Sequence, residues 1–125
     1  MYFEILTLEI SATRLGWDVI KPALARGASG IDHRFSFLAT DEGQSYAFDF
    51  YENVGSIEVL RSYAKKLDTS VSVSVVCLVG KPTEEAKRLA MQYRMRVMAP
   101  AELENLSLLK VLEVQHPRRV AYNQN

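Results

Sequence analysis

The stretches that decide the fold are GASGIDHRF at residues 27–35 and YAFDFYE at residues 46–52. The first leads into residues 33–40, which alternate apolar and polar side chains, and the second is rich in aromatic residues; both patterns are typical of β-strands. The turn-forming residues 41–44 between them predict an antiparallel hairpin with strands at residues 33–40 and 46–52. Asp32 at the entry of the first strand and Asp49 inside the second are therefore candidates for one shared polar site.

Before this hairpin, the sequence predicts one helix and one strand. Apolar residues recur at helical spacing over residues 3–15, and residues 17–22 alternate as a strand that ends at Pro22. A Gly-rich loop carrying Arg26 then leads to Asp32. The inner positions of the helix are expected to be Ile5, Leu8, Ala12 and Leu15.

After the hairpin, helices and strands alternate. Ser56 is placed to cap a helix, residues 71–79 form an apolar central strand, and residues 80–83 lead into a second helix. Residues 96–100 form a short last strand, and a final helix follows. The expected buried stripes of the three helices are Ile57, Leu60, Ala64 and Leu67, then Ala86, Leu89, Ala90 and Tyr93, and last Leu103, Leu106, Leu109 and Leu112.

This element order predicts an α/β fold with a single mixed β-sheet flanked by helices on both faces. The chain of 125 residues, 48% of them hydrophobic, has the size of one domain. We expect that domain to span residues 1–115 and to be followed by a mobile polar tail at residues 116–125.

Composition excludes several classes of protein. Fifteen basic and fifteen acidic residues give no net charge, although residues 1–60 hold nine acids against four bases and residues 61–125 hold six against eleven. The basic half is either an ordinary solvated surface or a phosphate-binding patch.

Cys77 is the only cysteine, which rules out an intrachain disulfide and a cysteine-based zinc site. The sequence shows neither a secretory signal nor a membrane-spanning stretch, so we expect a cytoplasmic protein without membrane contact.

Several short segments, in their order and spacing, resemble the PD-(D/E)XK superfamily. This is the restriction-endonuclease-like fold that includes archaeal Holliday-junction resolvases and Mrr-type endonucleases. The similar segments are RLGWDV at 14–19, GID at 30–32, FDFY at 48–51, and the helix, strand and turn at 86–103. The resemblance covers roughly residues 1–104 and implies this fold for the chain.

The resemblance also implies a site for a divalent cation. In the family, two carboxylates hold the metal ion against the scissile phosphate and a lysine stabilises developing charge. Asp32 and Asp49 correspond to those carboxylates, with Mg2+ as the cofactor of an active enzyme. Side chains two apart on a strand share a face, so Tyr51 stands where the family has lysine. A phenol carries no positive charge near neutral pH.

Other residues are weaker candidates for this site. Lys65 or Lys66 on the following helix is expected either to replace the missing lysine or simply to face water. Glu4 or Glu9 is a candidate for an additional acidic ligand, and His33 is a candidate metal ligand.

Three functions remain open from the sequence. The leading hypothesis is a catalytically degenerate restriction-endonuclease-like domain that binds DNA or RNA or serves assembly. The second is an active metal-dependent nuclease with a displaced lysine. The third is a protein-interaction module that forms a homodimer, motivated by the leucine spacing at residues 103–112, which either completes the core or pairs with a second copy.

Overall fold

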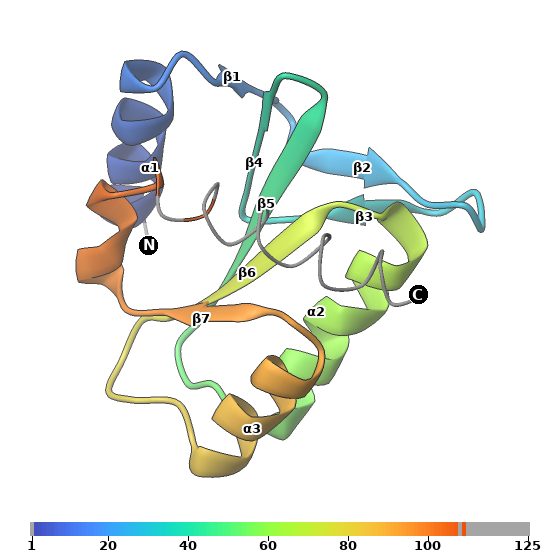
Figure 1. The fold of residues 1–125 in the computed structure, drawn as a ribbon, viewed down its shortest axis with the longest axis vertical. Coiled ribbons are helices and arrows are strands. Elements are labelled where there is room, and N and C mark those ends of the chain that lie inside the picture. The colour runs from blue at the N-terminus through green and yellow to red at the C-terminus, as the bar shows by residue number, and fades with distance from the viewer. Residues whose placement is uncertain (1, 108, 110–125) are drawn as a thin grey trace, which may run out of the picture.

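The computed structural model describes residues 2–107 and residue 109 (Figure 1). The order of elements confirms the predicted alternation after the first hairpin. In chain order the elements are α1 (Tyr2–Arg14), β1 (Asp18–Val19), β2 (Leu24–Arg26), β3 (Asp32–Arg34), β4 (Phe37–Asp41), β5 (Gln44–Tyr51), α2 (Ser56–Thr69), β6 (Ser72–Cys77), α3 (Glu84–Gln92), β7 (Arg96–Met98) and the 3₁₀ turn η1 (Pro100–Glu104).

A five-stranded sheet in the order β1-β4-β5-β6-β7 forms the centre of the fold. Strands β1, β4 and β5 are antiparallel, whereas β5, β6 and β7 run parallel, so the prediction of a mixed sheet is confirmed. The β4–β5 hairpin turns at Glu42 and Gly43, both with positive φ, as the favoured two-residue hairpin turns require.

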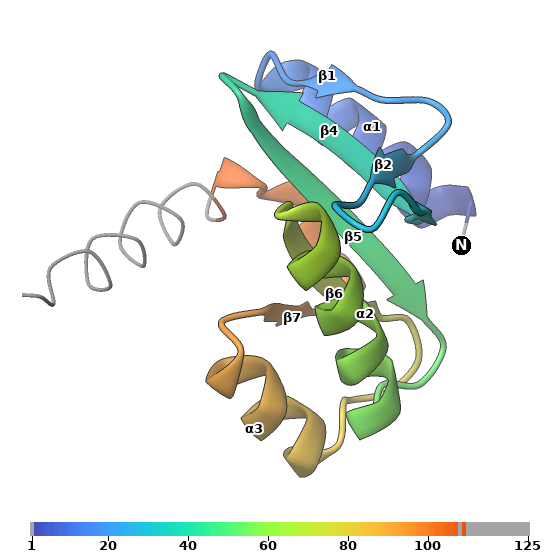
Figure 2. The same ribbon diagram turned by 90° about the vertical axis from the view of Figure 1, so that its right-hand side faces the viewer.

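Helices cover both faces of this sheet, as predicted (Figure 2). Phe48 and Phe50 point into a core shared with α1, whereas the alternate positions of β5 face α2 and α3. The first core includes Leu8, Ala12, Trp17, Phe37, Tyr46, Val76 and Leu103, and the second includes Phe35, Ala47, Val59, Val73, Val75, Ala86 and Ala90.

The stretch predicted as one strand at residues 33–40 is divided between two sheets. The N–H of Phe35 donates to the carbonyl of Ala23, while the N–H of the next residue, Ser36, donates to the carbonyl of Phe48. The chain therefore changes partner between these two residues. Strands β2 and β3 pair as a separate two-stranded sheet, and the loop predicted before Asp32 is the turn of that hairpin.

The predicted buried stripe of α2 is wrong. Ile57, Leu60 and Leu67 are 62%, 43% and 64% exposed, whereas Val59 and Ser62 are fully buried. The helix is rotated so that polar bonds, described below, hold its inner face. Its first turn is capped by Glu58, whose carboxylate accepts from the N–H of Gly55, and not by Ser56.

The other helices agree more closely with expectation. In α1, Leu8 and Ala12 are buried and Ile5 is partly so, but Leu15 is 43% exposed beyond the helix end. Thr83 caps α3 by accepting from the N–H of Ala86 at 3.1 Å. No helix within residues 2–107 combines the length and apolar character that a bilayer crossing demands.

The leucine-rich segment near the end closes the core beside α1. Leu103, Leu106 and Leu109 are each at most 4% exposed, although the chain at Pro100–Glu104 is a 3₁₀ turn and not the start of a regular α-helix. The sequence leaves two roles open for this stripe, completion of the core or pairing with a second copy. These three leucines complete the core. Leu112 and the expected tail at residues 116–125 lie outside the described residues.

Candidate functional site

Among the residues that the structure describes, Asp49 is the most deeply buried charged one, and only 4% of its surface is exposed. It lies on β5 opposite Val75 of the parallel strand β6, on the face covered by α2. Aspartate is disfavoured inside strands, and a buried charge is tolerated only where it is paired and hydrogen-bonded. The partners of Asp49 therefore decide what it does.

Both carboxylate oxygens of Asp49 have partners on α2. The Lys65 ammonium lies 2.9 Å from Oδ1, and the Ser62 hydroxyl donates to Oδ2 at 2.6 Å. Lys65 also donates to the carbonyl of Arg34 at 2.7 Å, and its Nζ lies 4.6 Å from the centre of the Phe35 ring. One ammonium thus joins β5, α2 and the end of β3.

Tyr51 extends this cluster along the same face of β5. Its hydroxyl is 3.0 Å from the Ser62 oxygen. Because the Ser62 hydrogen is given to Asp49, the phenol is the donor, and the chain of bonds runs from Tyr51 through Ser62 to Asp49. Burial is the largest cause that raises the pKa of Tyr51, and the negative charge of Asp49 raises it further. The phenol stays neutral at physiological pH.

Asp32 is not brought to this cluster. It lies on β3 in the small sheet, its side chain is 50% exposed, and its Oδ1 is 3.2 Å from Nε of Arg26 on the paired strand. Asp49 belongs to the large sheet and is enclosed under α2. The two carboxylates expected to share one cation are thus held by different partners in different sheets.

Ser36 occupies the position that sequence reasoning missed. Ser36 lies one residue before β4, outside the paired register, and its N–H donates to the carbonyl of Phe48 at 2.9 Å. The Ser36 hydroxyl accepts from the N–H of Phe50 at 3.0 Å. These two bonds join Ser36 to the backbone on either side of Asp49, and the side chain at this position is a hydroxyl and not a second carboxylate.

The remaining candidates lie elsewhere. Lys66 donates to the carbonyls of Tyr93 and Arg94 at 3.1 and 3.2 Å, and Glu9 pairs with Lys21 at 2.8 Å on α1. Glu4 also belongs to α1, which covers the opposite face of the sheet. Within the part of the chain that the structure describes, no three acidic, histidine or cysteine side chains are grouped as a metal site.

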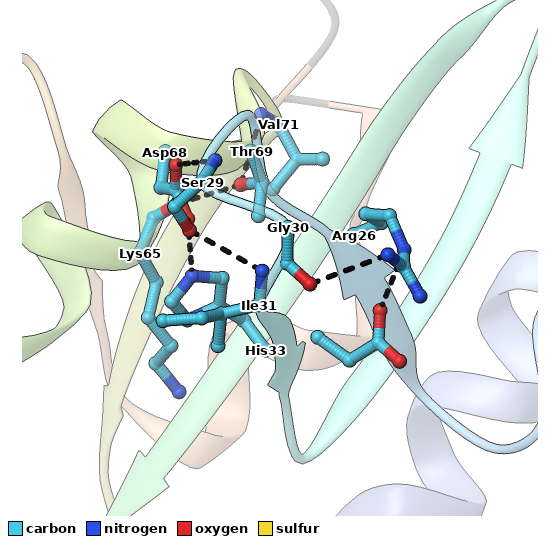
Figure 3. A network of polar contacts seen from close by, with 10 residues as sticks. Arg26, Ser29, Gly30, Ile31, His33, Lys65, Asp68, Thr69 and Val71 are labelled. Atoms are coloured by element: carbon cyan, nitrogen blue, oxygen red, sulfur yellow. Dashed lines mark hydrogen bonds and ion pairs between the residues drawn. The ribbon is translucent and has the colours of Figure 1, made fainter.

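His33 belongs to a second polar cluster, at the tip of the β2–β3 hairpin (Figure 3). Its Nε2 is 2.7 Å from Oδ2 of Asp68 in the last turns of α2, and the Ser29 hydroxyl donates to the same oxygen at 2.6 Å. The N–H groups of Ser29 and Ala28 donate to the Asp68 carboxylate and carbonyl. Since the Ser29 hydrogen goes to Asp68 and not to His33, the geometry is not that of a nucleophilic serine. The cluster anchors the hairpin to α2.

This anchor predicts a measurable dependence of stability on acid pH. The bond from the Ser29 hydroxyl, then those from His33 and the Ser29 N–H, lower the pKa of Asp68 from 3.8 to about 2. A carboxyl whose pKa is lower in the folded protein stabilises it fully above about pH 4, and that contribution is lost as the pH falls toward 2.

The test compares urea midpoints of the wild type and Asp68→Asn between pH 6 and pH 2. We expect the wild type to be the more stable protein at pH 6 and the difference to shrink below about pH 4. Ser29→Ala, which removes the strongest donor, should show a smaller loss over the same interval. A difference that stays constant down to pH 2 would mean that Asp68 gains nothing from its partners.

Comparison with known proteins finds a solved structure of similar fold but gives no function. No protein-family model and no curated protein matches the sequence. A solved structure described as the protein of unknown function AF1548 matches with a TM-score of 0.61 and 17% sequence identity. The match covers 77% of this chain and 57% of that one. At this identity the similarity shows a shared fold alone.

Proposed function

We propose that this chain is a catalytically degenerate restriction-endonuclease-like domain that acts by binding a partner and not by cleaving phosphodiester bonds. The observation that carries the proposal is that both oxygens of the buried Asp49 carboxylate are already bound within the protein. The Lys65 ammonium donates to Oδ1 at 2.9 Å and the Ser62 hydroxyl donates to Oδ2 at 2.6 Å. In the sequence resemblance, Asp49 and Tyr51 correspond to the family's acid and lysine, and here Asp49 binds Lys65 and Ser62 while Tyr51 binds Ser62.

These residues do not fit a divalent cation. Mg2+ requires near-ideal octahedral oxygen geometry and usually one or two carboxylates in addition to water and phosphate oxygens. A metal ion at Asp49 would have to displace an ammonium from a side chain that is 5% exposed, with Ser36 and Tyr51 as the neighbours. Asp32 is engaged with Arg26 on the small sheet. We therefore assign Asp49 to holding α2 on the sheet.

The binding role is better supported for a protein partner than for a nucleic acid. The chain has no net charge, which offers no overall attraction to phosphates. Large apolar side chains are instead exposed along α1 and along α2. Isolated exposed apolar residues are common, but a contiguous stripe on one element favours a protein contact.

An active nuclease with a displaced lysine is the second candidate, and one contact favours it. Lys65 reaches Asp49 from α2, as a lysine that had moved from strand to helix would do. In that case Lys65→Met would abolish cleavage while the protein remained folded.

A cleavage assay decides between these candidates. Purified protein is incubated with Mg2+ or Mn2+ and with branched, single-stranded and duplex DNA and with RNA; we expect no cleavage of any substrate. Cleavage that disappears in both Asp49→Asn and Lys65→Met, but persists in the exposed-site control Asp32→Asn, would establish the second candidate. Binding to the same nucleic acids that weakens steeply as salt is raised would replace the protein partner by a phosphate-containing one.

A further inference from the structure

The β2–β3 hairpin, residues 23–34, forms a sheet of its own beside the end of α2 (Figure 1). In the part of the chain that the structure describes, Ile20 is the last residue before the hairpin whose N–H bonds to the large sheet, and Ser36 is the first to do so after it. A two-stranded hairpin is only marginally stable alone. Its contacts with the rest of the fold therefore decide whether it stays in place.

Apolar packing holds this hairpin only weakly. Ala23 and Ala25 pack against the core under α2 and are partly buried, while Ile31 near the tip is 60% exposed. Phe35 is buried, but it lies at the base, one residue before the chain joins the large sheet. A buried methyl group removes little apolar surface from water. The polar contacts with α2 are therefore the main attachment of the hairpin.

The tip of the hairpin is closed around one carboxylate. Asp68 accepts from the N–H and the hydroxyl of Ser29 at 2.9 and 2.6 Å, and Nε2 of His33 lies 2.7 Å from it (Figure 3). Gly27 approaches the same carboxylate so closely that a β-carbon on it would overlap the carboxylate atoms. The tip closes only with the acceptor oxygens of Asp68 and without a side chain at Gly27.

The base of the hairpin lies over the ion pair of Asp49 with Lys65. Lys65 precedes Asp68 by three residues on α2, donates to the carbonyl of Arg34 at 2.7 Å, and has its Nζ 4.6 Å from the centre of the Phe35 ring. The same ammonium lies 2.9 Å from Asp49, and the Lys65 side chain is 22% exposed. Movement of the hairpin would uncover the cation that neutralises the buried carboxylate.

We propose that the β2–β3 hairpin is a strap that opens and closes over Lys65, with Asp68 as its latch. The structure shows the closed state. In the open state the tip leaves Asp68, the base leaves Lys65, and the large sheet and α2 remain folded. The strap thereby controls the access of solvent and other molecules to the Asp49–Lys65 pair. This opening belongs to the fold itself and does not depend on the partner-binding role proposed above.

Hydrogen exchange of the wild type, followed by mass spectrometry at increasing sub-denaturing urea, tests the opening. We expect the amides of residues 24–34 to exchange through a local opening that exposes little surface, so that their rate changes little with urea. The amides of β6 should exchange through unfolding of the sheet, with a rate that rises steeply with urea. A hairpin that exchanges at the same rate and with the same urea dependence as β6 would overturn the strap.

Two variants test the latch by different means. Asp68→Asn removes the charge, and Gly27→Ala places a methyl group where the carboxylate lies. Each should raise the exchange rate of the hairpin at least about tenfold, because hydrogen bonds to a charged group are weakened or lost. Asp32→Asn, which removes only the pair with Arg26 across the hairpin, is the matched control and should change the rate less than about threefold. In an Asp68→Ala background, Gly27→Ala should have little further effect, since the carboxylate that its methyl group meets is gone.

Acetylation by acetic anhydride tests access to Lys65. In Asp68→Asn, Lys65 should react several times faster than in the wild type, whereas Lys66, bonded to the carbonyls at the end of α3, should react at an unchanged rate. Faster hairpin exchange without faster acetylation of Lys65 would show that the hairpin does not control access to this residue. Unchanged hairpin exchange in both Asp68→Asn and Gly27→Ala would show that Asp68 is no latch. Either result would overturn the proposal.

Discussion

Replacing Lys65 by methionine is expected to lower the free energy of unfolding by about 3 kcal/mol, because it leaves a buried carboxylate without its counter-charge. The Asp49 side chain is 5% exposed and that of Lys65 is 22% exposed, so water compensates the loss only in part. The substitution also removes the bond to the Arg34 carbonyl and the contact with the Phe35 ring. Urea unfolding at pH 7, followed by circular dichroism, measures the change.

Two further variants make this result specific. Lys87→Met removes an ion pair with Glu84 whose side chains are 46% and 87% exposed, and it should cost less than about 0.5 kcal/mol. The double variant Asp49→Asn/Lys65→Met should be more stable than the sum of the single losses predicts, since it removes both charges together. If Lys65→Met cost no more than Lys87→Met, Asp49 would not depend on Lys65.

The second large effect concerns the leucines. Leu106→Ala is expected to cost about 2 to 4 kcal/mol, because Leu106 is 1% exposed in the core beside α1 and its truncation leaves a cavity. Leu67→Ala removes the same atoms from a site that is 64% exposed, and should cost less than about 0.5 kcal/mol.

Urea midpoints of the two alanine variants, measured at one low protein concentration, give the comparison. The sequence alone predicts both leucines in buried stripes and therefore similar losses of stability. Equal losses would contradict the structure, in which only Leu106 is buried. A large loss in Leu67→Ala alone would mean that α2 packs on the sheet with its apolar side inward.

The parts of the fold that the sequence predicts correctly are those fixed by local chemistry. Glu42 and Gly43 set the two-residue turn of the β4–β5 hairpin, and Thr83 with the acidic residues after it begins α3. The apolar run at residues 71–79 contains β6, which lies between β5 and β7 in the sheet and is covered on both faces. Each of these signals lies within a few residues of the element that it specifies.

The parts that the sequence predicts incorrectly depend on contacts between distant segments. Hydrophobic periodicity places Ile57, Leu60 and Leu67 inside, but the buried charge on β5 selects the side of α2 that carries Ser62 and Lys65. Periodicity reports which residues share a face and not which face is anchored. Periodicity also fails to predict that residues 33–40 are divided between two sheets. The alternation continues through Phe35 and Ser36, although the partner strand changes between these two residues.

The candidate site was predictable in part. Asp49 stands out because an acid between two phenylalanines in a strand needs a partner, and Lys65 was one of two lysines proposed to reach it. The GID motif predicts Asp32 as a second carboxylate beside Asp49, whereas the residue that bonds to the backbone on either side of Asp49 is Ser36. The assignment of partners to Asp32 and to His33 depends on the β2–β3 hairpin, which sequence periodicity did not reveal.

The claim that Asp49 holds α2 on the sheet and binds no cation is tested most directly by the thermal unfolding midpoint with and without about 10 mM Mn2+. A site with a dissociation constant of about 0.1 mM would be stabilised by about 2.7 kcal/mol at this concentration. We predict the same Mn2+ response, within error, for the wild type and for Asp49→Asn. A rise in the wild-type midpoint that is absent from Asp49→Asn would show that the carboxylate binds metal, and would contradict its structural role.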